Sequence, residues 1–123
     1  MKIYNSLTKQ KEEVEGGVVR MYCCGITPYK PVHIGNYRTY IFEDVLRRAL
    51  EYSGKDVKHI QNITDIGETD SAGHDKVSDD AQNIVCRFIR DLGRLNILLP
   101  HKFCWASDYI VEQQDLILSL IHI

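Results

Sequence analysis

His33 and Asn36 stand three residues apart across Gly35, where an apolar strand pattern gives way to a helical one. An imidazole and a carboxamide are both neutral hydrogen-bond donors that can reach an anion held over the start of a helix. The unpaired backbone N–H groups of a helix N-terminus favour such anions already. Gly35 lacks a Cβ and lets a ligand approach closely. The motif predicts a phosphate site at which His33 and Asn36 stabilise developing charge.

Two adjacent cysteines, Cys23 and Cys24, end the apolar run before this motif. A thiolate here could bind a metal beside the phosphate, but neighbours on a strand point to opposite faces and do not easily share one ion. Cys86 and Cys104 complete no C-x-x-C pair, and we interpret them as buried thiols of a reducing compartment. The other histidines have no ligand spacing, and only His74, in an acidic segment, is a candidate metal partner.

A strand, a helix and a second strand are expected to position these groups. Val18–Cys24 is almost continuously apolar, which predicts a strand covered on both faces of a parallel sheet. The helix is expected from about residue 34 to 53, with Gly54 as its left-handed cap. Residues 57–63 predict the second strand, whose polar His59 and Gln61 require polar surroundings or partial exposure. Ligands of such units bind beyond the carboxyl ends of the strands.

One of these ends is the loop 24–31, and the other is the turn 62–65. Small polar side chains in that turn could fix the ammonium or carboxylate of an amino acid, or Asn62 and Asp65 could simply cap the turn. We expect the Cys24 sulfur and the His33 imidazole to converge over one pocket at this edge of the sheet. No GxxxxGK[ST] or GxGxxG motif is present, so phosphate would be bound without a Walker lysine.

The helix 34–53 has apolar residues at helical spacing, which predict one wide buried stripe. The i,i+4 pairs Glu43–Arg47 and Asp44–Arg48 predict a solvated opposite face. The expected stripe consists of Ile41, Phe42, Val45, Leu46, Ala49, Leu50 and Tyr52.

The remaining chain predicts an edge strand over residues 3–8, a charged loop over 9–15 and a polar surface loop over 67–80. A strongly amphipathic helix covers about 81–95, with Asp79 and Gln82 as a capping pair. A last apolar helix, capped by Ser107 or Asp108, has no terminator, which predicts a truncated protein.

Composition sets broad limits on function. The 123 residues are 44% hydrophobic and 26% charged, as in one soluble domain, and the formal net charge is −2. No basic patch beyond Arg47–Arg48 would attract a polyanion. No signal peptide or membrane-spanning run is recognisable, so we expect a cytoplasmic protein.

Residues 21–36, Arg38–Thr39 and Asn62–Asp65, with the opening Ile3–Thr8, closely resemble the N-terminal part of cysteinyl-tRNA synthetase. The resemblance covers about residues 1–110. It implies a partial Rossmann-like (HUP-type) α/β fold with a parallel sheet and crossover helices, the first half of a class I synthetase catalytic domain. Such enzymes activate cysteine with ATP to cysteinyl adenylate and pyrophosphate, then transfer the cysteinyl group to tRNA.

The implied partners are cysteine, ATP with Mg²⁺ and tRNA(Cys), with zinc as the metal and a monomeric parent enzyme. A zinc–thiolate bond would distinguish cysteine from serine, which shape alone does poorly. The other zinc ligands and the lysine loop of the family lie outside this chain, so we expect the 123 residues alone to be inactive and their last helix to mediate self-association. The resemblance implies that His33 and Asn36 are catalytic and that Cys24 binds zinc. The residues implied for ATP are His33, Gly35, Asn36 and Thr27. The residues implied for the substrate cysteine are Cys24, Gly25, Thr27 and Thr64.

One departure from the family pattern lies beside the site. Thr27-Pro28-Tyr29-Lys30 replaces the usual Thr-Val-Tyr-Asp and places a cation near the nucleotide entrance. Two other readings remain open at this stage: a ligase that joins cysteine to an amino sugar by the same adenylate chemistry, and a non-catalytic nucleotide-binding or interaction module.

Overall fold

Three parallel strands in the order β3-β4-β5 form the sheet that carries the site. A computed structural model describes residues 1–67 and 80–121. The parallel pairing of β3 with β4 across helix α1 confirms the expected β-α-β unit, and α2 lies between β4 and β5 in the chain. The α/β fold with crossover helices is thus the one predicted. The bounds are β3 Val18–Ile26, α1 Ile34–Tyr52, β4 Asp56–Ile63, α2 Ala81–Arg94 and β5 Lys102–Trp105.

Strand β5 was not expected from the sequence. Its four residues are too few to show alternation, and the strand forms because its backbone extends the sheet along β4, in register from Ile60↔Lys102 to Ile63↔Trp105. The connection between α2 and β5 turns back at Asn96, whose φ of 56° is left-handed.

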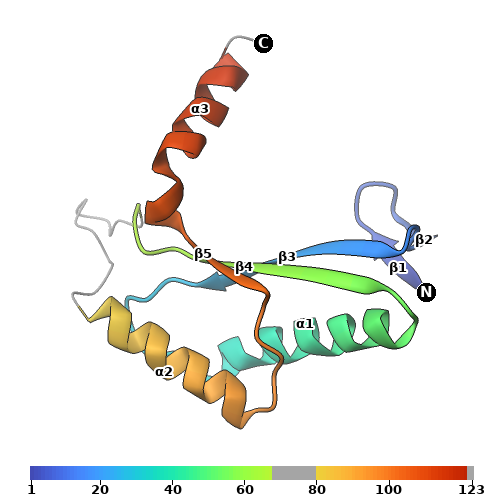
Figure 1. Ribbon diagram of the computed structural model, residues 1–123, viewed down its shortest axis with the longest axis horizontal. Coiled ribbons are helices and arrows are strands. Elements are labelled where there is room, and N and C mark those ends of the chain that lie inside the picture. Colours follow the sequence, from blue (N-terminus) through green and yellow to red (C-terminus); the bar gives the residue numbers. More distant parts are fainter. Residues whose placement is uncertain (68–79, 122–123) are drawn as a thin grey trace.

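The sheet is covered by helices on one face only, which corrects the expectation for Val18–Cys24. Figure 1 shows α1 and α2 together on one side of the strands, with α3 (Ile110–Ile121) rising from the other. Exposure alternates along β3: Val18 and Tyr22 are 54% and 69% exposed, whereas Cys23 is buried. The apolar run was read as two-sided because it is continuous, but only every second residue meets a helix in the described structure.

The buried face of α1 agrees only in part with the predicted stripe: Leu50 is buried, and Leu46 and Ala49 are half-buried. Phe42, Val45 and Tyr52 are exposed, whereas Asp44 and Arg47 are buried. The connection 95–100 crosses this face and presents backbone groups that need partners.

Three charged side chains of α1 supply these partners. The Asp44 carboxylate accepts the Leu98 N–H at 2.9 Å, Arg47 donates to the Leu99 carbonyl at 2.8 Å and Arg48 donates to the Asn96 carbonyl at 2.7 Å. Asp44 pairs with Arg48 as expected, but Arg47 pairs with Glu51 rather than Glu43. The predicted solvated face is therefore a polar contact with the α2–β5 connection.

The hydrophobic core lies between the carboxyl half of the sheet, the start of α1 and helix α2. Phe88 of α2 is 1% exposed and its ring lies 5.0 Å from the Tyr40 ring, centroid to centroid. The amphipathic pattern of α2 is confirmed by the burial of Ile84, Val85, Phe88 and Leu92. Cys86 lies on the opposite face and is exposed, so the prediction that it is buried was wrong, and Cys104 is half-buried.

A two-stranded antiparallel hairpin precedes the sheet. β1 (Lys2–Asn5) pairs with β2 (Gln10–Glu13), so the segment 9–15 predicted as a charged loop contains a strand. Its side chains are all exposed, so no apolar alternation marked it. Gly16 adopts a left-handed φ of 73° between β2 and β3.

A short 3₁₀ segment, Ala106–Tyr109, leads into α3. The Ser107 N–H and hydroxyl both donate to the Asp65 carboxylate, at 3.0 and 2.5 Å, and the cap of α3 by Ser107 or Asp108 stays a prediction. The apolar side chains of α3 are exposed as expected, and self-association through them stays a prediction.

The loop 68–79, with His74 and the Asp79 cap, lies outside the described residues. The residue that precedes α2 in the described structure is Asp80. None of the described helices has the length and apolarity that crossing a bilayer requires.

Candidate active site

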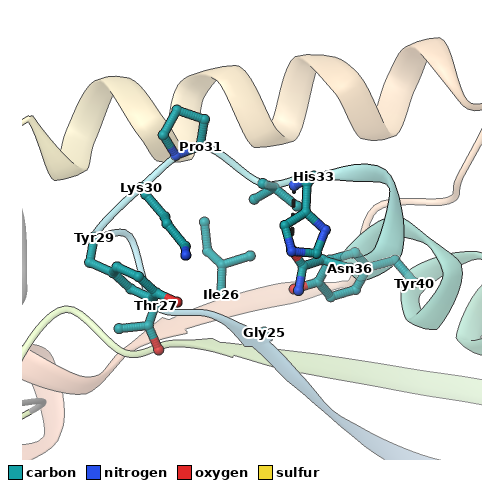
Figure 2. Close-up of a pocket in the computed structure, with 10 residues that line it drawn as sticks. Gly25, Ile26, Thr27, Tyr29, Lys30, Pro31, His33, Asn36 and Tyr40 are labelled. Atoms are coloured by element: carbon teal, nitrogen blue, oxygen red, sulfur yellow. Dashed lines mark hydrogen bonds between the residues drawn. The ribbon is translucent and has the colours of Figure 1, made fainter.

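A pocket of about 300 Å³ opens at the carboxyl end of β3, against the first turn of α1. This is the edge of the sheet at which the sequence predicts a ligand site, and the size falls within the range of small-molecule sites. Figure 2 shows the loop after β3 curving around the pocket and delivering its side chains to it. The lining residues are Gly25, Ile26, Thr27, Tyr29, Lys30, Pro31, Val32, His33, Asn36 and Tyr40.

His33 and Asn36 form a reciprocal capping box at the start of α1. The Nδ1 atom of His33 accepts the Gly35 N–H at 3.1 Å, and the Asn36 side-chain oxygen accepts the His33 N–H at 3.3 Å. An imidazole that accepts through Nδ1 carries its proton on Nε2, and an amide that accepts through its oxygen keeps both N–H groups free. The capping box therefore leaves hydrogen-bond donors on both side chains beside the pocket.

Lys30 brings a positive charge to the same pocket from the loop. Its ammonium lies 5.1 Å from the centroid of the Tyr29 ring, a cation–π contact that holds the flexible side chain. Figure 2 shows Lys30 reaching into the space on the side opposite His33 and Asn36. The cation expected from the Pro28-Tyr29-Lys30 departure is thus present at the pocket, together with the positive end of the α1 dipole.

The floor of the pocket depends on a close approach between β3 and β4. The pairing shifts between Cys23 and Ile26, and Gly25 lies in this irregular stretch. Its N–H donates to the side-chain oxygen of Asn62 at 2.8 Å, and the Asn62 amide donates to the Thr64 hydroxyl at 2.9 Å. A Cβ on Gly25 would lie 1.6 Å from the Asn62 carbonyl oxygen, so only glycine fits.

Two side chains of the turn 62–65 make hydrogen bonds to other parts of the described chain. Asn62 ties β3 to the end of β4, and Asp65 holds Ser107 at the start of the 3₁₀ segment. These contacts are structural, but they join the turn to Gly25 and Ser107 rather than cap it, and the binding of an amino acid by this turn stays a prediction. Thr64 does not line the pocket, so its assignment to the substrate cysteine stays a prediction.

Some of the remaining predicted site residues line the pocket and others lie beside it. Thr27, His33 and Asn36 line it, whereas Gly35 lines a shallower hollow on the next side of α1. Cys24 is exposed and adjoins the pocket through its neighbour Gly25.

Tyr40 is a further residue of the pocket lining. Burial, then the nearby Glu43 and Cys24, raise the pKa of Tyr40, which itself lines the pocket. The convergence of the Cys24 sulfur and the His33 ring stays a prediction. Sequence reasoning missed Tyr40 as a pocket residue, although its spacing of four from Asn36 places both on one face of α1.

No group of candidate metal ligands in the described residues includes Cys24, the residue predicted to bind zinc. Within residues 1–67 and 80–121, the one group of three candidate metal ligands does not include Cys24. A single exposed thiolate does not hold zinc firmly, so no chemical step at this pocket is assigned to zinc.

The sequence is similar to a known protein family and to several enzymes. Residues 10–123 match the family described as "tRNA synthetases class I (C) catalytic domain". The chain is 40% identical, over 98% of its length, to a cysteine–tRNA ligase of a Cyanothece species, and 45% identical over 81% to cysteine–tRNA ligase 1 of Burkholderia lata. It is 37% identical over 95% to the cysteine–tRNA ligase of Treponema denticola. The chain spans about a quarter of the length of these relatives, at 26%, 24% and 27%.

Proposed function

Because this chain belongs to the class I (C) tRNA synthetase catalytic-domain family, we propose that it is the nucleotide-binding part of a cysteine–tRNA ligase. In the reaction, a carboxylate oxygen of cysteine attacks the α-phosphorus of ATP. The bond from that phosphorus to the bridging oxygen breaks, which gives cysteinyl adenylate and pyrophosphate. The cysteinyl group then passes to the terminal adenosine of tRNA(Cys).

The capping box at the start of α1 is the observation that carries this proposal. It directs the Nδ1 atom of His33 and the oxygen of Asn36 into the helix, so the groups left for a ligand are all donors. Neutral donors fixed beforehand stabilise negative charge as it grows on the phosphate oxygens in the transition state. Lys30 and the helix N-terminus add attraction for the triphosphate before reaction.

Other parts of the assignment rest on the family. Thr27 and Gly35 are proposed to bind ATP together with His33 and Asn36. The residues proposed for the substrate cysteine are Cys24, Gly25, Thr27 and Thr64. ATP with Mg²⁺ is the proposed nucleotide, zinc at Cys24 the proposed metal of the longer enzyme, and the cytoplasm the proposed location. No described residue outside Cys24 is assigned to that zinc.

A chimaera tests the proposal. The segment of the Cyanothece enzyme that matches this chain is replaced by residues 1–123, and cysteine-dependent exchange of pyrophosphate into ATP is measured. We expect exchange by the chimaera and a loss of about 10²–10³-fold with His33→Ala. Ile34→Ala is the matched control, because this adjacent side chain is 78% exposed and does not line the pocket.

Equal exchange by the chimaera and its His33→Ala variant would contradict the role of His33. The isolated 123-residue chain is expected to show no exchange, because part of a nucleotide site does not position both reactants. Appreciable exchange by the isolated chain would refute that expectation.

A further inference from the structure

Three potential metal ligands meet on the helix-covered side of the sheet, and none of them lines the phosphate pocket. They are Cys23 of β3, Glu43 of α1 and His59 of β4, and their donor atoms all lie within 4.8 Å of one another. Cys23 and His59 are 7% and 4% exposed, and Glu43 is half-buried. The positions 23, 43 and 59 match no ligand spacing, so only the fold brings these residues together.

The burial of the His59 ring is not explained by any hydrogen bond to the described part of the chain. Both ring nitrogens are buried, and neither has a hydrogen-bond partner in residues 1–67 and 80–121. Burying an unpaired polar group is costly, and buried histidines normally donate or accept at least once. The ring instead faces the Cys23 sulfur and the Glu43 carboxylate, which is the arrangement of a ligand set.

We propose that Cys23, Glu43 and His59 bind a zinc ion that links β3, α1 and β4. One thiolate, one imidazole and one carboxylate are all common zinc ligands, and the mixed soft and hard donors favour zinc over calcium or magnesium. Ligand atoms around tetrahedral zinc lie roughly 3.3–3.8 Å apart, given bonds of about 2.0–2.3 Å, so donor atoms that lie within 4.8 Å of one another need to approach by at most about 1.5 Å.

The surroundings of the cluster suit this role. Gln61 donates from its amide to the Glu43 carboxylate at 3.3 Å and to the Cys24 carbonyl at 3.3 Å, which orients the carboxylate. A cavity of about 10 Å³ lies against Glu43 and His59, on the scale of one water molecule, which would complete the coordination.

Zinc binding also balances charge and protons. When the zinc–sulfur bond forms, the S–H bond breaks and the proton leaves to the buffer, without oxidation or reduction. The dication then compensates one thiolate and one carboxylate beside the neutral imidazole.

This site shares no ligand with the zinc that the family resemblance places at Cys24, and the two adjacent cysteines make a matched pair of variants. The purified 123-residue chain is freed of metal, and Co²⁺ or Zn²⁺ is titrated in. Binding is followed by the sulfur-to-cobalt charge-transfer band, the bound zinc is counted by elemental analysis, and melting temperature is measured with and without zinc.

We expect the wild type and Cys24→Ala to bind one equivalent, to show the charge-transfer band and to melt at a higher temperature with zinc. Cys23→Ala and His59→Gln should lose the band and the zinc-dependent shift, and Glu43→Gln should weaken binding. Circular dichroism establishes that each variant is folded, and Glu43→Gln carries the test if the Cys23 variant is not.

Absence of tight binding by the wild type would overturn the proposal. Retention of the band in Cys23→Ala, or its loss in Cys24→Ala alone, would overturn it as well. Neither result bears on adenylate formation, which the chimaera measures separately.

Discussion

Replacing Gly25 by alanine is expected to disrupt the sheet at the point where the pocket is built. The added Cβ would lie 1.6 Å from the Asn62 carbonyl oxygen and 2.8 Å from its carbonyl carbon. Ordinary contact begins at 3.4 Å, so the two strands must separate locally by 1.8 Å (3.4 minus 1.6). Both obstacles are backbone atoms of a central strand, so no side-chain rotation relieves the contact.

The cost can be estimated from what this separation breaks. The hydrogen bonds that flank the contact run from Gly25 N–H to the Asn62 side chain at 2.8 Å and from Thr64 N–H, just after β4, to the Ile26 carbonyl at 2.9 Å. Losing both, at about 1 kcal/mol each, and straining a packed region by about 1–3 kcal/mol gives a loss of about 4 kcal/mol in unfolding free energy. For a chain of this size the melting temperature should fall by roughly 15 °C.

Thermal denaturation followed by far-ultraviolet circular dichroism checks this value. Gly93→Ala is the control, because its Cβ would meet no atom within 4 Å and it lies inside helix α2. Alanine should stabilise that helix by about 1 kcal/mol, so the control should melt higher than the wild type. If Gly25→Ala melts within about 3 °C of the wild type, the close approach of β3 and β4 is wrong.

Three other substitutions test separate parts of the structure. Phe88→Ala should cost about 3–5 kcal/mol of unfolding free energy in denaturant titrations, since Phe88 is 1% exposed in the core. Asp44→Ala should cost about 2 kcal/mol in the same measurement, because it leaves the Leu98 N–H without its acceptor. Tyr37→Phe should reduce the loss of stability at alkaline pH. Burial and the neighbouring Asp91 raise the pKa of Tyr37 from 10.0 to about 12, so the unfolded chain loses this proton first and stability falls between those pH values.

Each substitution has an exposed counterpart. Phe42→Ala, at a residue 69% exposed, should change stability by less than about 0.5 kcal/mol, and a similar loss in both phenylalanine variants would contradict the assigned core. Asp56→Ala removes only a surface ion pair with Lys58 and should have little effect. Tyr52→Phe, at a residue 96% exposed, is the matched control, and an alkaline stability profile of Tyr37→Phe identical to that of the wild type would refute the explanation.

The polar face of α1 shows how tertiary structure overrides an amphipathic reading. Apolar spacing correctly predicted that Leu50 is buried, but it also favoured Val45 and Phe42, which are exposed. Asp44 and Arg47 are buried in their place. An irregular segment that crosses a helix exposes backbone N–H and carbonyl groups, and charged side chains satisfy them better than apolar ones do. The periodicity of a helix does not reveal which backbone will cross it.

Local sequence determined the β3-α1-β4 unit and the place of its pocket. Apolar strands, the prolines that delay α1 and the residues His33 to Asn36 act on their immediate neighbours, so their consequences can be read in order along the chain. The capping box is the clearest case, because both of its hydrogen bonds span at most three residues.

Tertiary structure alone decided strand β5, the single covered face of the sheet and the cluster of Cys23, Glu43 and His59. Each depends on segments far apart in sequence: β5 on pairing with β4, and the cluster on two strands and a helix that meet through the crossover. Hydrogen bonds and packing between distant segments leave no periodic signal in either segment by itself. These segments meet only when the chain folds. The sequence therefore indicated the phosphate pocket but not the cluster of Cys23, Glu43 and His59.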